Sequence, residues 1–526
     1  MKLTNIWSEI SSMLYWTMLA ACTVGPGTVV TCARAGAEYG MSMIWALVFA
    51  SILAYTLQEG TARLTIVSGK SLGQCLRMKY RNGAKIYDTA VICWMVGICV
   101  FFGNTLYECN NWAGGIDAIL AIPGATDTTP LRVGCCVAYA VLVLALLYWD
   151  KVDSLGVVLG MMMMGMVCLF LVVVIIMGLD FAELGRGLIP NMPEKKSETS
   201  AEPADMILSL VGTTSIGFNL FLGGTMAKGK KLESSQRGIA FSTISALEVS
   251  VLILIVGAGT YNANHGEAFC ILTLANFIKN FIGEIGVFVF SIGFIAAAIS
   301  SMLAVPLGAG LTVESVFSES EGERDETCIS DHAVQIGLIN EKNITVDQLG
   351  DGTEAKMKDD ETKQPLTGEP GEDKNLEMVE EGRKAKELPR FVYWGIISVM
   401  VVVATLVISL DAPRTHVILV AQVFNGCLLP FFAICLLVCL NDPQFMSSSP
   451  QPAWANCFLF TSVTITVFLA SNVFLQKLFG HLLSGVWMKI GLAGGSAGLG
   501  MLALCIFTSL GSDLVNSFRS SRGVQT

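Results

Sequence analysis

The sequence reads GPGT at residues 25–28 and GTTSIGFN at residues 212–219, and both stretches interrupt long apolar runs. Glycine and proline disfavour a continuous helix at such points. A helix in lipid must satisfy its own backbone polar groups, so a break at mid-membrane survives only where it is buried or lines a cavity. Paired breaks at corresponding positions of two halves are typical of the substrate site of an inverted-repeat transporter. The two stretches therefore predict a transport function.

The bulk composition indicates an integral membrane protein that crosses the bilayer many times. The 526 residues are 53% hydrophobic and 14% charged, with a mean hydropathy of +0.61. A soluble domain carries about 25% charged residues, so this composition argues against a soluble multidomain enzyme. Apolar segments of about 20 residues, long enough to span a membrane, recur along the chain. The twelve expected segments are residues 11–34, 42–66, 86–108, 131–149, 154–178, 205–226, 236–261, 280–306, 390–410, 415–440, 453–475 and 485–509.

Several other sequence features exclude common classes of function. The first apolar segment lacks a preceding basic region and a cleavage pattern, so we expect no signal peptide. Most of the 16 cysteines lie inside apolar segments without disulfide or zinc spacing, and we expect them to pack as small hydrophobic residues. A phosphate-binding GxxxxGK[ST] loop is also missing, which argues against direct drive by ATP. We therefore expect no enzyme activity, no cofactor and no nucleic-acid partner.

Charge patterning predicts how the chain is oriented and divided. Lys and Arg gather at residues 77–85, 228–237 and 383–390, which fall on one side of the membrane if the N-terminus is cytoplasmic. Residues 318–389 contain 20 Asp and Glu but 9 Lys and Arg, so their net charge is −11 and the rest of the chain is nearly neutral. A segment this polar should be disordered and cytoplasmic, and it could bind a cytoplasmic partner. The expected parts are residues 1–317 with eight spans, the loop 318–389, and residues 390–526 with four spans.

Five motifs, in the right order, resemble those of the Nramp family of divalent-metal transporters. They lie within residues 57–72, 187–190, 212–224, 296–317 and 421–431. The helix 6 stretch GTTSIGFNLFLGG is similar to the family's GATVMPHNLYLHS almost position by position. The resemblance implies an all-α, LeuT-like fold with two inverted five-helix repeats, two further helices, and discontinuous helices 1 and 6. It also implies transport of a divalent metal ion, coupled to protons in the manner of a symporter.

The resemblance also implies that the family's usual metal ligands are replaced in this chain. The family's helix 1 motif is D-P-G-N, and here Gly25 stands at the Asp position and Thr28 at the Asn position. Ile216 stands where the family has a soft Met ligand, and Phe218 stands where it has a His. The retained or substitute metal ligands that the resemblance implies are Thr28, Thr213 and Gln422. The wider set of substrate-site residues is Cys22, Gly25, Pro26, Gly27, Thr28, Thr213, Ile216, Gly217, Phe218 and Gln422.

The remaining ligand set leaves more than one substrate open. Carbonyl, hydroxyl and amide oxygens carry no formal charge, and a bare divalent ion among neutral groups is costly, so a hydrated cation is favoured over a bare one. A Gly-x-Gly break at the start of a half-helix could instead present N–H groups to the carboxylate of a small organic or anionic solute. A third alternative is a receptor or scaffold that has lost transport, with residues 318–389 as its output.

Two acidic residues inside apolar segments are candidates for a proton or ion pathway. Ionisable groups within membrane spans are functional candidates by default. Glu108 ends the third expected segment and stands where the family has the Glu of a helix 3 D-x-x-E pair, whose Asp is Thr105 here. Glu248 lies in the middle of the seventh expected segment. The sequence leaves open whether the protein resides in the plasma membrane or in an internal membrane.

Overall fold

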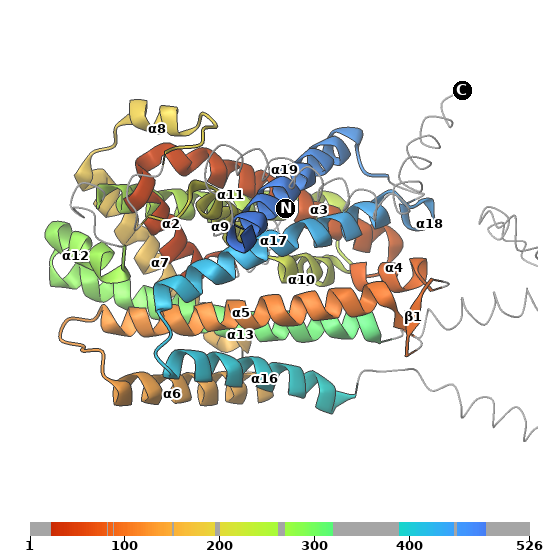
Figure 1. Ribbon diagram of the computed structural model, residues 1–526, viewed down its shortest axis with the longest axis horizontal. Coiled ribbons are helices and arrows are strands. Elements are labelled where there is room, and N and C mark those ends of the chain that lie inside the picture. Colours follow the sequence, from red (N-terminus) through yellow and green to blue (C-terminus); the bar gives the residue numbers. More distant parts are fainter. Residues whose placement is uncertain are drawn as a thin grey trace, which may run out of the picture. The chain divides into compact units, whose positions relative to one another are not determined.

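The computed structural model describes residues 23–81, 83–87, 89–149, 152–194, 200–260, 269–318, 389–446 and 450–479 (Figure 1). The chain divides into two compact units, one formed by Met1–Val316 with Arg390–Thr526 and the other by Phe317–Pro389. Nearly all of the second unit, the expected acidic loop, lies outside the described residues. The expected segment 485–509, the first half of segment 11–34, and Cys22 also lie outside them.

Helices make up almost all of the described chain, as the sequence predicts. The elements are α2 (Pro26–Tyr39), the 3-10 helix η1 (Gly40–Met43), α3 (Ile44–Ser68), α4 (Leu72–Lys79), β1 (Lys85–Ile86), β2 (Thr89–Ala90), α5 (Val91–Leu120), α6 (Thr129–Tyr148), α7 (Val152–Met177), α8 (Phe181–Gly187), α9 (Pro203–Thr214), α10 (Gly217–Ala227), α11 (Leu232–Gly259), α12 (Ile271–Ile282), α13 (Glu284–Phe317), α16 (Arg390–Ser409), α17 (Arg414–Leu440), α18 (Pro443–Met446) and α19 (Ala453–Phe479). The two short strands pair antiparallel, with Lys85 opposite Ala90.

The long helices confirm a multi-pass membrane protein. Within the described residues, ten helical stretches are long and apolar enough to span a bilayer, and one of them, Pro26–Ser68, joins two of the expected segments. These stretches account for the first eleven expected segments, although only part of the first is described. The helix α5 runs on to Leu120, so Glu108 lies in the interior of a helix. The sequence had placed it at the end of the helix, and that prediction was wrong. Because the expected segment 86–108 was bounded by hydropathy, the polar stretch that continues the helix was missed.

Both predicted helix breaks are present. Gly25 is the extended residue that precedes α2, and Pro26 occupies the first helical position, where its missing N–H costs no helical hydrogen bond. In the second break, α9 ends at Thr214, Ser215 and Ile216 are non-helical, and α10 begins at Gly217. Within the described residues, a half-helix follows each break, α2 after the first and α10 after the second, and α9 is the half-helix that precedes the second.

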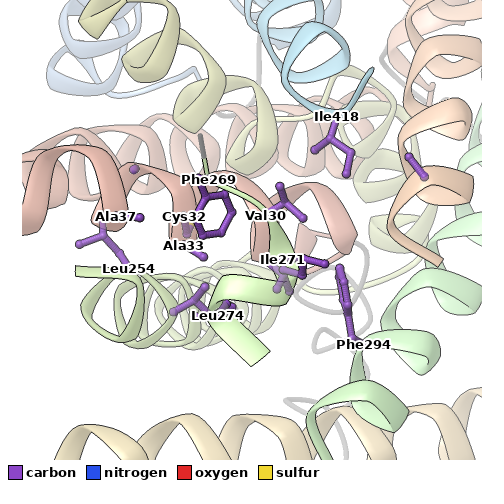
Figure 2. Close-up of a cluster of buried hydrophobic side chains, with 14 of the residues drawn as sticks. Val30, Cys32, Ala33, Ala37, Leu254, Phe269, Ile271, Leu274, Phe294 and Ile418 are labelled. Carbon is purple, nitrogen blue, oxygen red and sulfur yellow. The ribbon is translucent and has the colours of Figure 1, made fainter. Parts of the chain in front are cut away.

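The packing of the half-helices shows the inverted repeat. The half-helix α2, which follows the first break, packs along α11, and the half-helix α10, which follows the second break, packs along α3. In the inverted repeat α10 is the equivalent of α2, and α3 is the equivalent of α11. The α2–α11 crossing is very close, because a Cβ added at Gly36 or at Gly257 would overlap the backbone of the opposite helix. Figure 2 shows the apolar core around this crossing, where Ala33 and Ala37 of α2 lie near Leu254 of α11.

The short helix α12 also contributes to this core and was not expected from the sequence. Its buried residues Ile271, Leu274, Ala275 and Ile278 recur at helical spacing and form one apolar face. Figure 2 shows Ile271 and Leu274 among the side chains of the same cluster. A helix of 12 residues is too short to span a bilayer. It packs against α5, α7 and α11.

A chain of ion pairs ties together the ends of four long helices. Arg414 at the start of α17 pairs with Asp117 near the end of α5 at 2.5 Å and with Asp127 at 3.0 Å. Arg132 of α6 pairs with the same Asp127 at 3.0 Å and with Asp411, in the loop after α16, at 2.9 Å. In Figure 1, α6 and α16 lie side by side, in agreement with their many shared contacts. These pairs connect α5, α6 and α17 with the loop that follows α16.

Candidate functional site

The two helix breaks meet, and side-chain hydrogen bonds join them. The Thr28 and Thr213 hydroxyl oxygens lie 2.9 Å apart, and the Thr28 hydroxyl also lies 2.5 Å from the Thr23 carbonyl oxygen. In the opposite direction, the Asn219 amide donates to the Thr23 hydroxyl at 3.4 Å. All four residues are buried. Two of the three expected metal ligands, Thr28 and Thr213, are therefore neighbours.

The third expected ligand, Gln422 of α17, lies against the first turn of α2. Its side chain is fully buried, and neither its amide nitrogen nor its amide oxygen has a hydrogen-bond partner in the described structure. A Cβ added at Gly27 would overlap this amide, so glycine is required for the approach. Buried polar groups without partners are rare because leaving one unpaired costs about 1–3 kcal/mol. An unpaired amide at a helix break indicates a place for a ligand.

A second unpaired group, which the sequence did not single out as a site residue, lies at Gly25. The Ser301 hydroxyl of α13 is buried without a hydrogen-bond partner among the described residues. It occupies the space that a Cβ on Gly25 would need. The Ser301 side chain therefore fills part of the volume that a longer side chain at residue 25 would take. The only signal for it was its place in a motif of small residues in the eighth span.

The helix α5 brings a line of polar side chains to the same region. The Asn110 amide nitrogen lies about 3.1 Å from the position of a Cβ on Gly27. It donates to the Asn111 side-chain oxygen at 3.3 Å, and Asn111 donates to Glu108 Oε2 at 2.9 Å. Glu108 is fully buried, and its other oxygen has no partner in the part of the chain that the structure describes. Two amides thus connect this carboxylate to the helix 1 break.

The other acidic candidate lies elsewhere. Glu248 is exposed on α11, on the same helical face as the exposed Phe241 and Ile244. The buried face of this helix, which carries Ser242 and Ala246, points toward the breaks. Glu108 is therefore connected to the first break through Asn111 and Asn110, whereas Glu248 is exposed on the opposite face of its helix from Ser242 and Ala246.

The remaining expected site residues mostly shape the breaks. Pro26 packs against Gly114 of α5, where a Cβ would overlap the proline ring. Gly217 packs against the ring of Phe432 in the same way, and Ile216 is 1% exposed. Cys22 and the side chain of Phe218 lie outside what the structure describes.

The site is polar but carries little formal charge. Among the described residues, no group of three or more His, Cys, Asp or Glu side chains is placed to hold a metal ion. The groups that face the breaks are hydroxyls and amides, with the Glu108 carboxylate behind them. Such oxygens suit a hard cation that keeps part of its hydration shell, and they offer no soft donor.

Two broken helices that meet at a buried polar site, within an inverted repeat of membrane helices, define a secondary transporter of the LeuT-like fold. The chain matches the profile of the natural resistance-associated macrophage protein-like (Nramp) family over residues 17–327 and 377–476. These ranges cover more than half of the sequence. The chain belongs to the Nramp family.

Individual relatives agree with this assignment. The chain is 23% identical to the divalent metal cation transporter MntH of Yersinia pestis over 304 residues, which are 56% of this chain and 70% of the relative. It is 24% identical to MntH of Latilactobacillus sakei over 316 residues, 57% of this chain and 66% of the relative. The structure of a manganese transporter from Eremococcus coleocola, at 16% identity, superposes with a TM-score of 0.59 and covers 97% of this chain and 96% of its own. At this identity the superposition shows a shared fold.

Proposed function

We propose that this protein transports a divalent metal ion across a membrane, with the ion bound at the two helix breaks. The observation that carries the proposal is the buried, unpaired Gln422 amide against Gly27, beside the joined Thr28 and Thr213 hydroxyls. Membership of the Nramp family and the metal-transporting relatives support the substrate class. The function is transport, and we assign the protein no chemical reaction.

The ion bound here should be hard and partly hydrated. Magnesium and manganese accept oxygen ligands, and magnesium commonly keeps several waters when it binds a protein. With Gly25 and Ile216 at the usual Asp and Met positions, direct ligands would be neutral oxygens. The Glu108 carboxylate, connected through Asn111 and Asn110, would supply the nearest negative charge. It would also be the candidate carrier for a coupled proton.

The geometry argues against the organic-solute alternative. A carboxylate bound by the first turn of α2 would need open space beside Gly25 and Gly27. That space holds the Ser301 hydroxyl and the Gln422 amide. A receptor without transport would depend on residues 318–389, nearly all of which lie outside the described residues. We place the N-terminus, this loop and the basic clusters on the cytoplasmic side.

The test is uptake of manganese and magnesium into proteoliposomes that contain the purified full-length protein. We expect saturable uptake above that of empty liposomes and a strong reduction in Gln422→Ala. Glu248→Gln is the matched control, because this residue is exposed and lies away from the breaks, and its uptake should be unchanged. A folded Gln422→Ala variant with wild-type uptake of both ions would contradict the proposed site.

Proton coupling is tested in the same preparation with and without an inward pH gradient. Glu108→Gln keeps an acceptor for the Asn111 amide but removes the ionisable group. We expect the gradient to stimulate wild-type uptake and not that of Glu108→Gln. If the gradient stimulates both proteins equally, Glu108 does not carry the proton.

A further inference from the structure

A small cavity lies beside the two helix breaks, and Gln422, Asn110 and Ser301 are not among the residues that line it. It has room for about one water-sized sphere. The lining residues are Thr23, Ala54, Gln58, Thr214, Ser242, Thr243 and Ala246. They come from the first break, from α3, from the end of α9 and from α11, so four separate segments close around one point. Five of the seven side chains are polar, which makes this cavity a candidate binding site.

The polar groups of the cavity are mainly hydrogen-bond acceptors. Thr214 donates its hydroxyl hydrogen to the Leu210 carbonyl at 2.8 Å, and Thr243 donates to the Ile239 carbonyl at 2.9 Å. Each hydroxyl has one hydrogen, so these two oxygens can only accept from, or coordinate, what enters the cavity. The lining thus offers electron pairs and few hydrogens.

The Gln58 side chain adds a further acceptor oxygen to the cavity lining. It is 4% exposed, and its amide oxygen has no hydrogen-bond partner in the described part of the chain. Rotation of the amide by half a turn exchanges the positions of oxygen and nitrogen, so the oxygen can be presented to the cavity without moving the backbone. A buried acceptor left unpaired is costly, and a cation or a water in the cavity would satisfy it.

The charge around the cavity sets the valence of its ligand. The nearest carboxylate in sequence, Glu59, is already engaged, since it pairs with Arg63 at 2.6 Å and accepts from Gln236 at 2.7 Å. No Asp or Glu is among the lining residues. Neutral oxygens compensate a single positive charge far more readily than two, because the cost of removing an ion from water rises steeply with its charge.

We propose that this cavity is a second cation site, which binds a monovalent ion, namely sodium, among the oxygens of Thr214, Ser242, Thr243 and Gln58. Its small volume favours sodium over the larger potassium ion. Because the lining includes residues of both breaks and of the helices behind them, sodium would stabilise the arrangement in which the breaks lie together. The proposal goes beyond divalent-metal transport and does not depend on it.

The experiment measures thermal unfolding of the purified full-length protein, free of divalent metals, as sodium chloride replaces choline chloride at constant ionic strength. A ligand that binds only the folded state raises the unfolding midpoint as its concentration exceeds its dissociation constant. We expect a saturable rise with sodium and a weaker one with potassium. Ser242→Ala should raise the half-saturating sodium concentration by roughly fivefold or more, the factor for loss of one neutral contact.

The control is Ser291→Ala in α13, which likewise removes the hydroxyl of a buried serine, but of one that does not line the cavity. Its sodium response should equal that of the wild type. If Ser242→Ala does not fold, Thr243→Val tests the same cavity. Equal stabilisation by sodium and choline would overturn the proposal and leave the cavity to a water molecule. An unchanged sodium response in the cavity variants would overturn it too. Since no transport is measured, failure here leaves the metal-uptake result unaffected.

Discussion

Thr28 and Thr213 are 185 residues apart in sequence, and their buried hydroxyl oxygens lie 2.9 Å apart where the two breaks meet. A second bond, from Asn219 to Thr23, joins the same two breaks in the opposite direction. Thr28 and Asn219 each lie three residues after the residue that precedes their half-helix, Gly25 before α2 and Ile216 before α10. Each therefore reaches from its own repeat to the segment that precedes the break in the other. The inverted repeat thus bonds the two breaks to each other twice.

Replacement of Thr28 by valine should weaken this junction. Thr28→Val keeps the shape of the side chain but removes its contacts with the Thr213 hydroxyl and the Thr23 carbonyl. We expect a loss of about 1–3 kcal/mol in stability, because buried groups are left unpaired, together with a large reduction in metal uptake. Thermal unfolding and proteoliposome uptake measure both effects.

The control for this change is Thr225→Val. Thr225 is exposed, and its hydroxyl donates to the Phe221 carbonyl within its own helix. The free energy of unfolding of Thr225→Val should stay within about 0.5 kcal/mol of the wild-type value, as expected for a surface substitution. Equal effects of the two substitutions would mean that the Thr28–Thr213 contact has no special role.

The Gln422 side chain lies so close to Gly27 that a single methyl group on residue 27 would overlap its amide. Gly27→Ala should displace the Gln422 amide and reduce metal uptake to a level close to that of Gln422→Ala. Gly223→Ala is the matched control, since a Cβ there meets no atom within 4 Å. In the double variant with Gln422→Ala, the Gly27 substitution should add little further loss. Normal uptake by folded Gly27→Ala would argue that the amide is not a ligand.

The usual metal ligands can be restored only if the neighbouring hydroxyl is removed as well. In Gly25→Asp the new side chain would meet the Ser301 hydroxyl. The triple variant Gly25→Asp, Ile216→Met and Ser301→Ala should therefore bind manganese at least roughly tenfold more tightly than the wild type, because a carboxylate is a stronger ligand than a neutral oxygen.

Isothermal titration with manganese measures this gain. The double variant that retains Ser301 should gain less, because the hydroxyl still occupies the space of the carboxylate. A folded triple variant with no gain would show that Gly25 and Ile216 are not equivalent to the family's ligand positions.

The ion pairs at the helix ends predict a stability effect away from the site. Arg414→Met would leave Asp117 buried without its partner at 2.5 Å. Loss of one member of a buried pair is strongly destabilising, so we expect about 2–4 kcal/mol and a lower unfolding midpoint. Arg237→Gln removes an exposed pair with Glu233 and should change stability by less than about 1 kcal/mol. Similar midpoints for both variants would contradict the structural role of Arg414.

Much of the architecture could be predicted from local sequence. The breaks at residues 25–28 and 212–219 are marked by glycine, proline and short polar residues within apolar runs, and both breaks are confirmed. The helix α12 was missed because its 12 residues fall below the length that hydropathy detects, although one face is apolar. The extension of α5 beyond Glu108 was missed for a related reason, since its continuation is too polar for a hydropathy window.

The site itself could be predicted only in part. Thr28, Thr213 and Gln422 come together, and they were found through the resemblance. Ser301, Asn110 and Asn111 were not expected there, because a serine or asparagine within a span carries no local signal of what it faces. The environments of Glu108 and Glu248 were likewise indistinguishable before the structure.

By itself, the sequence determined that the chain enters the membrane many times and that its first and sixth spans are broken. Both properties depend on the transfer of short segments from water to lipid and on the backbone preferences of single residues, which are local. Tertiary structure alone decided which polar groups surround the breaks, that Glu108 is buried beside them, and that Glu248 is exposed. Those outcomes depend on how helices far apart in sequence pack and rotate against one another, which no local pattern records.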